Sequence, residues 1–239
     1  MNSWWIGLIH LSVAPWLPKL AWLSVRKRSD CVWRSQNCGT CLKAKPQGLT
    51  KKCVDCRIYI RQIQWISTFL ILITTSILIF QQRTGFDLLA SLLLLDFLLL
   101  VSWTDLWTGI IPNCLTLGGW FSFLVFRIFE HTQPFWQYFM AGLSIGIGLA
   151  LIAWLTRGMG LGDAKLMAVA GWVIGWPHIF TAFWLSTVSC MIYVIYRWLT
   201  EKSLSRLDKI PFAPHLAMGL FVADVWGEMG WSWYLSWFF

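Results

Sequence analysis

Eight stretches of this chain are apolar and of helix length, and this pattern limits the fold more than any other feature. They occupy about 4–23, 63–80, 86–103, 114–129, 135–156, 164–178, 180–199 and 212–236. A hydrocarbon core requires roughly 20 apolar residues per helix, whereas open sheets cannot face lipid. These runs also lack the alternation of barrel strands. The sequence therefore predicts an all-α polytopic membrane protein with about eight transmembrane helices, and Gly142-x-x-x-Gly146 predicts close packing of the fifth one.

The composition agrees with this class. Charged residues make up 13% of the chain, against about 25% in a soluble domain. Many of the 19 tryptophans lie near the ends of apolar runs, as an interfacial aromatic belt requires. Residues 4–23 lack a preceding basic segment and a following small-residue cleavage site. We therefore interpret them as the first membrane helix rather than as a signal peptide.

Positive charge is concentrated in one hydrophilic segment. Eleven of the 19 Lys and Arg residues fall between Lys19 and Arg61, and the net charge is +8. Cytoplasmic loops of membrane proteins carry such an excess, so we interpret 25–62 as a cytoplasmic loop and expect no nucleic-acid partner. The chain then divides into a first transmembrane helix (1–24), this basic loop (25–62) and a transmembrane core (63–239).

The same map predicts an orientation for the whole chain. Eight spans with the basic loop inside place both termini outside and the loops at 104–113, 157–163 and 200–211 inside. Arg83 and Arg127 are then the only basic residues near the outer face, and the other 17 lie at the inner face. This asymmetry supports the helix count and the orientation together.

Two C-x-x-C pairs lie in the basic loop, separated by eleven residues: Cys38 with Cys41 and Cys53 with Cys56. Each pair directs two sulfurs at one point, and two pairs complete a tetrahedral thiolate site that suits structural zinc. A reducing cytoplasm preserves thiols and favours a metal over disulfides. An iron centre and redox-active disulfides remain as alternatives, with Cys31 as a further candidate participant.

Two aspartates stand beside turns at the predicted inner face. Asp105 lies seven residues before Pro112, and Asp163 directly follows the Gly160-Leu161-Gly162 segment. An intramembrane acid is a functional candidate by default. Two carboxyl groups within a few ångströms share a proton, so one can activate water while the other donates to a carbonyl. The pair suggests peptide hydrolysis without Ser, Cys or metal; the alternative is that both are merely polar residues at the inner face.

Other polar residues offer less chemistry. Asp96 lies nine residues before Asp105, on the opposite helical face and roughly 13 Å deeper, where an acid suits a proton-coupled transporter. Asp224 and Glu228 fall toward the outer half of the last span. The four histidines lack metal-ligand spacing, and no G-x-S-x-G, H-E-x-x-H or Walker pattern occurs.

Three strings carry a resemblance to a known family. They are Asp105 followed by Ile111-Pro112-Asn113, then Gly160-Leu161-Gly162-Asp163-Ala164-Lys165-Leu166, then Pro211-Phe212-Ala213-Pro214-His215-Leu216-Ala217-Met218-Gly219. Together they resemble the bacterial type IV prepilin peptidases, which are intramembrane aspartic proteases of the G-x-G-D class. The resemblance runs from about residue 38 to residue 220.

The resemblance implies an endopeptidase of the bacterial inner membrane, with its active site facing the cytoplasm. Such an enzyme removes the basic leader from prepilins or pseudopilins, its protein partners in the bilayer, for type IV pili or type II secretion. Asp105 and Asp163 match the two catalytic aspartates. Gly160, Gly162, Lys165, Pro112 and Asn113 belong to the matching motifs, and the four loop cysteines match a zinc-binding loop of many bacterial members.

The chain departs from this family upstream. Typical bifunctional members carry a longer N-terminal region with a G-S-F-L-N-V-like first helix, and Trp5 to Arg34 contain no such string. Those members also N-methylate the new terminus with S-adenosylmethionine, a second activity that this departure leaves open. A different class of function would be a non-enzymatic, zinc-bearing membrane adaptor in pilus or secretion assembly. Its function would depend on Cys38 to Cys56 and not on the two aspartates.

Overall fold

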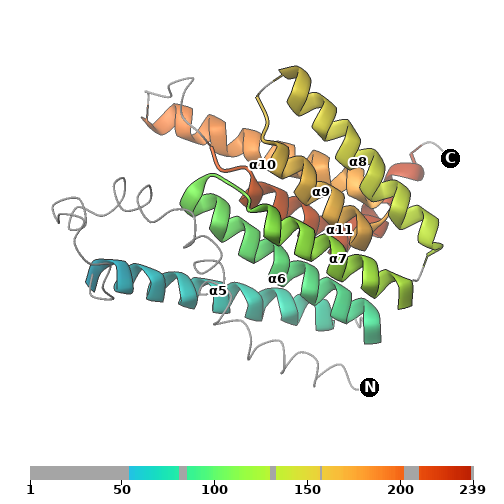
Figure 1. The fold of residues 1–239 in the computed structure, drawn as a ribbon, viewed down its shortest axis with the longest axis horizontal. Coiled ribbons are helices and arrows are strands. Elements are labelled where there is room, and N and C mark those ends of the chain that lie inside the picture. The colour runs from blue at the N-terminus through green and yellow to red at the C-terminus, as the bar shows by residue number, and fades with distance from the viewer. Residues whose placement is uncertain (1–53, 81–84, 130–132, 157, 202–209, 238–239) are drawn as a thin grey trace.

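The computed structural model describes residues 54–80, 85–129, 133–156, 158–201 and 210–237. All regular structure in these ranges is α-helical (Figure 1). The helices are α5 (Val54–Phe80), α6 (Gly85–Thr108), α7 (Asn113–Phe129), α8 (Phe135–Thr156), α9 (Leu161–Ile174), α10 (His178–Glu201) and α11 (Ala213–Leu235). Seven of the predicted apolar runs are thus confirmed as helices, while the run at 4–23 lies outside the described residues.

Proline and glycine determine several helix ends. Pro112, Pro134 and Pro177 stand just before α7, α8 and α10, and their carbonyls accept the first backbone hydrogen bonds of those helices. A proline at a helix start costs no backbone hydrogen bond, because an N–H at that position would have no partner within the helix. Gly109 directly follows the last residue of α6; it has φ of +62° and donates its N–H to the carbonyl of Asp105 at 2.7 Å. This is the left-handed terminal residue that glycine adopts without steric cost.

Three predicted boundaries were wrong. Helix α5 begins at Val54 rather than near 63, so it extends into the segment predicted as a loop. The aspartates were expected in the loops 104–113 and 157–163, but Asp105 lies in the last turn of α6 and Asp163 in the first turn of α9. Hydropathy marks the buried part of a helix, whereas backbone hydrogen bonding continues into polar residues at its ends.

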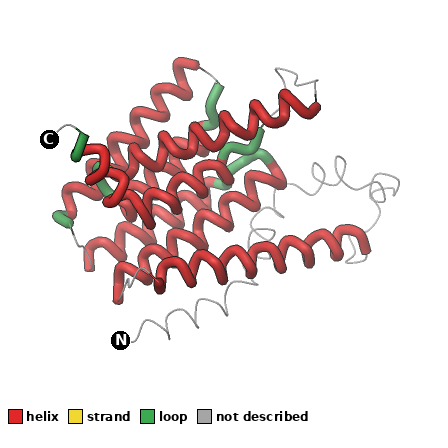
Figure 2. Tube along the Cα trace, turned by 180° about the vertical axis from the view of Figure 1, so that it is seen from behind, coloured by secondary structure: helices red, strands yellow, loops and turns green. Residues whose placement is uncertain are grey.

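Helix α9 lies at the centre of the bundle. It packs against α6, α7, α8, α10 and α11 (Figure 1). Most of its side chains are buried. A helix that is apolar on all sides is expected in such a position. Seen from behind, the long helices run alongside one another in a bundle (Figure 2). A second, smaller core cluster joins α5, α6 and α11.

Glycines allow the closest helix contacts. A Cβ added at Gly171 of α9 would come within 2.5 Å of the Cα of Gly142 in α8, and one at Gly146 within 2.8 Å of the Cβ of Ala168. The packing predicted from Gly142-x-x-x-Gly146 is therefore confirmed, with α9 as the partner helix. Gly219 has a similar role between α11 and α10, because its added Cβ would lie 2.4 Å from the carbonyl oxygen of Ala182.

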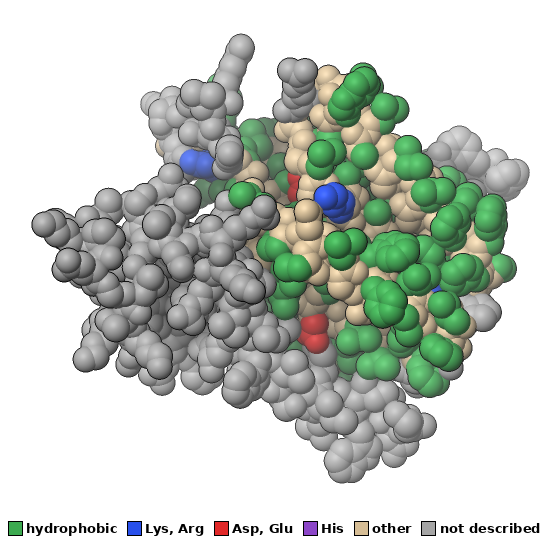
Figure 3. Space-filling model, in the orientation of Figure 1, with side chains coloured by type: hydrophobic (Ala, Val, Ile, Leu, Met, Phe, Trp, Pro, Cys, Tyr) green, Lys and Arg blue, Asp and Glu red, His purple; other side chains and the backbone are tan. Residues whose placement is uncertain are grey.

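Three helices of the described residues are long and apolar enough to cross a membrane: Phe86–Leu106, Phe135–Thr156 and His178–Thr200. Ile66–Ile79 and Asn113–Phe129 are shorter apolar helices. Figure 3 shows one face of the molecule, on which hydrophobic side chains are numerous and charged ones isolated. The polytopic class is thereby supported, and the full count of eight spans stays a prediction.

The contact between α8 and α9 predicts a sharp difference between two glycines. We expect Gly171→Ala to lower the free energy of unfolding by about 1–3 kcal/mol, because the added methyl group meets the backbone of α8. Gly148→Ala is the matched control, since its added Cβ meets nothing within 4 Å. That variant should be neutral or more stable by up to about 1 kcal/mol. Equal losses in detergent unfolding curves would contradict the proposed packing.

Candidate active site

Asp105 is buried where the end of α6 meets the start of α11. Its side chain is 7% exposed, and its Oδ2 accepts a hydrogen bond from the backbone N–H of Ala213 at 3.1 Å. Ala213 is the first residue of α11, and the first N–H groups of a helix have no partner within that helix. A carboxylate is also favoured there by the helix dipole. The Pro211-Phe212-Ala213-Pro214 turn thus presents a backbone donor to Asp105.

Asp163 is buried in the first turn of α9, with 9% of its surface exposed. Its N–H donates to the carbonyl of Gly160 at 3.1 Å. A Cβ at Gly160 would lie 3.3 Å from Oδ2 of Asp163, and a Cβ at Gly162 would lie 3.1 Å from the Cβ of Ile111. The two glycines therefore let the start of α9 fit closely around the carboxyl group and against the loop between α6 and α7.

The two carboxyl groups influence each other. Asp163 precedes the apolar part of α9 and lies outside the three candidate spans. The pKa of Asp163 is raised to about 7. Burial is the larger cause and the negative charge of Asp105 the smaller, while a backbone hydrogen bond from Gly160 opposes the shift. The structure thus brings together the two acids that the sequence singled out. Near neutral pH such a pair holds one proton between its members.

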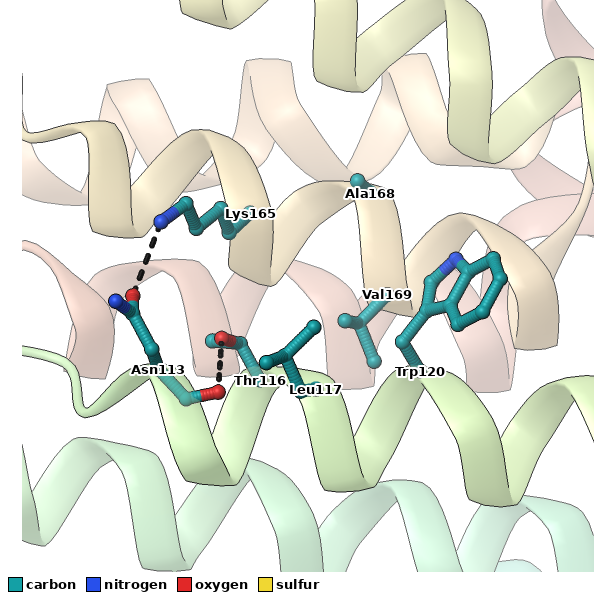
Figure 4. Close-up of a pocket in the computed structure, with 7 residues that line it drawn as sticks. All are labelled: Asn113, Thr116, Leu117, Trp120, Lys165, Ala168 and Val169. Atoms are coloured by element: carbon teal, nitrogen blue, oxygen red, sulfur yellow. Dashed lines mark hydrogen bonds between the residues drawn. The ribbon is translucent and has the colours of Figure 1, made fainter.

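Lys165 and Asn113 form a second link beside this pair. Nζ of Lys165 donates to Oδ1 of Asn113 at 3.0 Å, which joins the first turn of α9 to the start of α7 (Figure 4). Pro112 directly precedes Asn113 and begins that helix through its carbonyl. Pro112, Asn113 and Lys165 therefore lie together at one end of the bundle. Lys165 bonds an amide oxygen, not the carboxylate of Asp163.

The predicted metal ligands fall almost entirely outside the described residues. Cys38, Cys41, Cys53 and the further candidate Cys31 lie there, and for Cys56 only the backbone is described, in the first turn of α5. Within the described ranges, no group of three or more His, Cys, Asp or Glu side chains could hold a metal ion. Zinc binding by the basic loop therefore stays a prediction.

Sequence reasoning missed the role of Arg127. This side chain lies in the last turn of α7, is 5% exposed, and donates to the carbonyls of Trp172 and Val173 at 3.1 and 2.5 Å. Its guanidinium also stacks over the ring of Tyr138 at 4.2 Å. Arg127 thus binds the C-terminal end of the helix whose N-terminal end carries Asp163. The sequence did hold a signal for this role: Arg127 is a single cation within the apolar run 114–129. The sequence analysis placed it only near the outer face.

The structure thus combines a bundle of apolar helices with two buried aspartates, the features on which the sequence resemblance was based. Residues 92–195 match the model of the type IV leader peptidase family, and this range contains both Asp105 and Asp163. Two similar proteins are named prepilin leader peptidase/N-methyltransferase. The one from Aeromonas salmonicida (strain A449) is 30% identical over 158 residues, covering 64% of this chain and 54% of the relative. The one from Bacillus subtilis (strain 168) is 30% identical over 152 residues, covering 63% and 60%.

The resemblance found in the sequence motifs is therefore confirmed: this chain is similar to the type IV leader peptidases. The chain spans between half and two thirds of the length of these relatives. No solved structure matches it significantly.

The raised pKa of Asp163 predicts how stability depends on pH. A carboxyl group whose folded pKa lies above its ordinary value of 3.8 stabilises the fold most while both states are protonated. That contribution falls as the pH rises and is lost once the pH passes the folded pKa of about 7. Each pKa unit corresponds to about 1.4 kcal/mol. We expect wild-type stability in detergent to decline between pH 4 and pH 7, and Asp163→Asn to show a shallower decline; parallel curves would contradict the shift.

Proposed function

We propose that this chain is a membrane-embedded aspartic endopeptidase that cleaves the basic leader from type IV prepilins or pseudopilins. The observation that carries the proposal is the pair of buried carboxyl groups, Asp105 and Asp163, at one end of the helical bundle. The similarity of residues 92–195 to leader peptidases and the printed names of the relatives support the same reaction.

The two aspartates would divide the chemistry between them. The N–H of Ala213 stabilises negative charge on Asp105, so the shared proton resides preferentially on Asp163. Asp105 then accepts a proton from water as the water oxygen attacks the scissile carbonyl, and Asp163 donates its proton to the carbonyl oxygen. When the tetrahedral intermediate collapses, the C–N bond breaks, Asp105 passes its proton to the leaving amine, and ionised Asp163 takes a proton back from a hydroxyl group of the intermediate as the new carbonyl forms. The products are a leader carboxyl and a free amino terminus.

The site would face the cytoplasm from the bacterial inner membrane. The concentration of Lys and Arg between Lys19 and Arg61 supports this orientation through the positive-inside rule. A prepilin leader is basic and stays inside, while its apolar helix enters the bilayer. The bond between them would then lie at the depth of the two aspartates. Eight spans, with the basic loop inside, complete this arrangement.

Catalysis by the pair predicts the effect of removing either acid. We expect Asp105→Asn and Asp163→Asn each to lower the rate of leader removal by at least about 100-fold, because a positioned acid or base contributes at least that much. Asp87→Asn is the matched control, since Asp87 is exposed in the first turn of α6, at the opposite end of that helix. Cleavage of a purified prepilin in lipid vesicles measures all three. Near wild-type cleavage by either site variant would overturn the proposal.

The basic loop is proposed to hold structural zinc through Cys38, Cys41, Cys53 and Cys56. We expect the purified protein to contain about one zinc per chain, since four thiolates complete a tetrahedral site. Replacing Cys38 and Cys41 together by Ser should abolish the metal, whereas Cys190→Ser should retain it. Elemental analysis measures both. If metal content is unchanged in the double variant, the assignment is wrong. If pilus assembly depends on these cysteines and not on the aspartates, the adaptor is the better description.

The relatives' printed names include a second activity, N-methyltransferase. S-adenosylmethionine would be its methyl donor in this chain. Mass spectrometry of the mature substrate after cleavage reads both steps at once: the terminal residue reports the cleaved bond, and one added methyl group reports the transfer.

A further inference from the structure

A groove of about 290 Å³ runs between α7 and α9. It is lined by Asn113, Thr116, Leu117, Trp120, Lys165, Ala168 and Val169 (Figure 4). From Asn113 to Trp120 the lining spans two turns of α7, roughly 10 Å. Ligand pockets usually exceed about 300 Å³, so this groove suits a few side chains rather than a whole helix.

The polarity of the groove changes along its length. At one end Lys165 and Asn113 present exposed polar groups joined by their 3.0 Å hydrogen bond. Toward the other end the lining consists of Leu117, Trp120 and Val169. An occupant must therefore be polar at one end and apolar along the rest of this roughly 10 Å groove.

The polar end adjoins the proposed catalytic pair. Lys165 follows Asp163 by two residues on α9. Ile111 lies two residues before Asn113 and packs against Gly162. A Cβ added at Gly162 would lie only 3.1 Å from the Cβ of Ile111. The polar end of the groove therefore lies within one helical turn of Asp163 along α9, although the side chains of Asp163 and Lys165 project from different sides of that helix.

Cleavage of a membrane-embedded substrate creates a need that these two residues meet. A peptide bond within a helix must unwind before water can attack it, and unwinding frees backbone carbonyls that cost free energy in an apolar medium. Lys165 and Asn113 both carry N–H donors, and the ammonium forms the stronger, charge-assisted bonds. Donors placed here would satisfy the carbonyls that unwinding releases.

We propose that this groove binds the membrane helix of the protein substrate just after the scissile bond. Aliphatic side chains of its first two turns occupy the floor formed by Leu117, Trp120 and Val169. Carbonyls of the unwound segment accept hydrogen bonds from Lys165 and Asn113. This inference rests on the proposed protease function. An anionic lipid could use the same ammonium and apolar floor, but the adjacency to Asp163 favours the substrate.

Crosslinking tests occupancy without requiring turnover. The enzyme carries Asp163→Asn, to retain substrate, and Cys114→Ala, because Cys114 is exposed next to Asn113. Leu117→Cys places a thiol in the groove, and Leu151→Cys places one on the exposed face of α8 as a control; the two leucines are 67% and 52% exposed. A prepilin with one cysteine in the first two turns of its apolar helix is added in vesicles. We expect at least about tenfold more crosslinking at position 117, and equal yields above the background without introduced cysteines would overturn the proposal.

Kinetic measurements on the active enzyme distinguish the two candidate occupants of the groove, the protein substrate and an anionic lipid. Leu117→Trp fills the groove and should raise KM for prepilin by about tenfold with kcat changed less than twofold, whereas Leu151→Trp should change neither. Lys165→Met should also raise KM. An unchanged KM for Leu117→Trp, combined with a lost response to phosphatidylglycerol vesicles over phosphatidylcholine, would identify a lipid site and refute the proposal. Failure of the protease function itself is distinguishable, because the wild-type chain would then cleave no prepilin.

Discussion

The burial of Asp105 and Asp163 at one end of the bundle is the constraint on which the rest of the structure depends. A carboxyl group removed from water needs either a hydrogen-bond donor for its charge or a proton. The start of α11 supplies the donor for Asp105, and a raised pKa leaves Asp163 with the proton. Both solutions require the ends of α6, α9 and α11 to meet. The glycines and prolines of the three sequence strings are the residues that shape those ends.

Helix α9 carries this constraint through the bundle. Its 14 residues span about 21 Å, less than the roughly 30 Å of a hydrocarbon core, so it cannot reach both membrane faces. Its last carbonyls therefore end among apolar side chains, where Arg127 provides donors in place of water. That need explains why the bundle contains a buried cation. The depth of Asp163 is thus determined partly by a residue at the far end of the same helix.

The sequence predicted the helices well because each has an apolar run of the right length, and it predicted the acid pair because few other side chains could perform hydrolysis. It failed at the boundaries, where α6 continues past Trp103 to include Asp105. Hydropathy does not report backbone hydrogen bonds, so a polar last turn looks like a loop. The partners of Arg127 and of Gly219 were also out of reach. Both depend on a neighbouring helix distant in the sequence, and a single sequence does not reveal which helices touch.

The physical rule that makes this chain helical also limits where the proposed protease could cut. Within a bilayer every backbone group must be paired, so a substrate helix protects its own peptide bonds as the enzyme's helices protect theirs. Cleavage is feasible only where unwound backbone finds other partners. The loops between α6 and α7 and between α8 and α9, and the turn before α11, converge at such a place, as the contacts of Gly162 with Ile111 and of Ala213 with Asp105 show. Asp96, by contrast, lies in the interior of α6, about three helical turns from either end of that helix. The position of the pair at helix ends is therefore what the proposed cleavage requires.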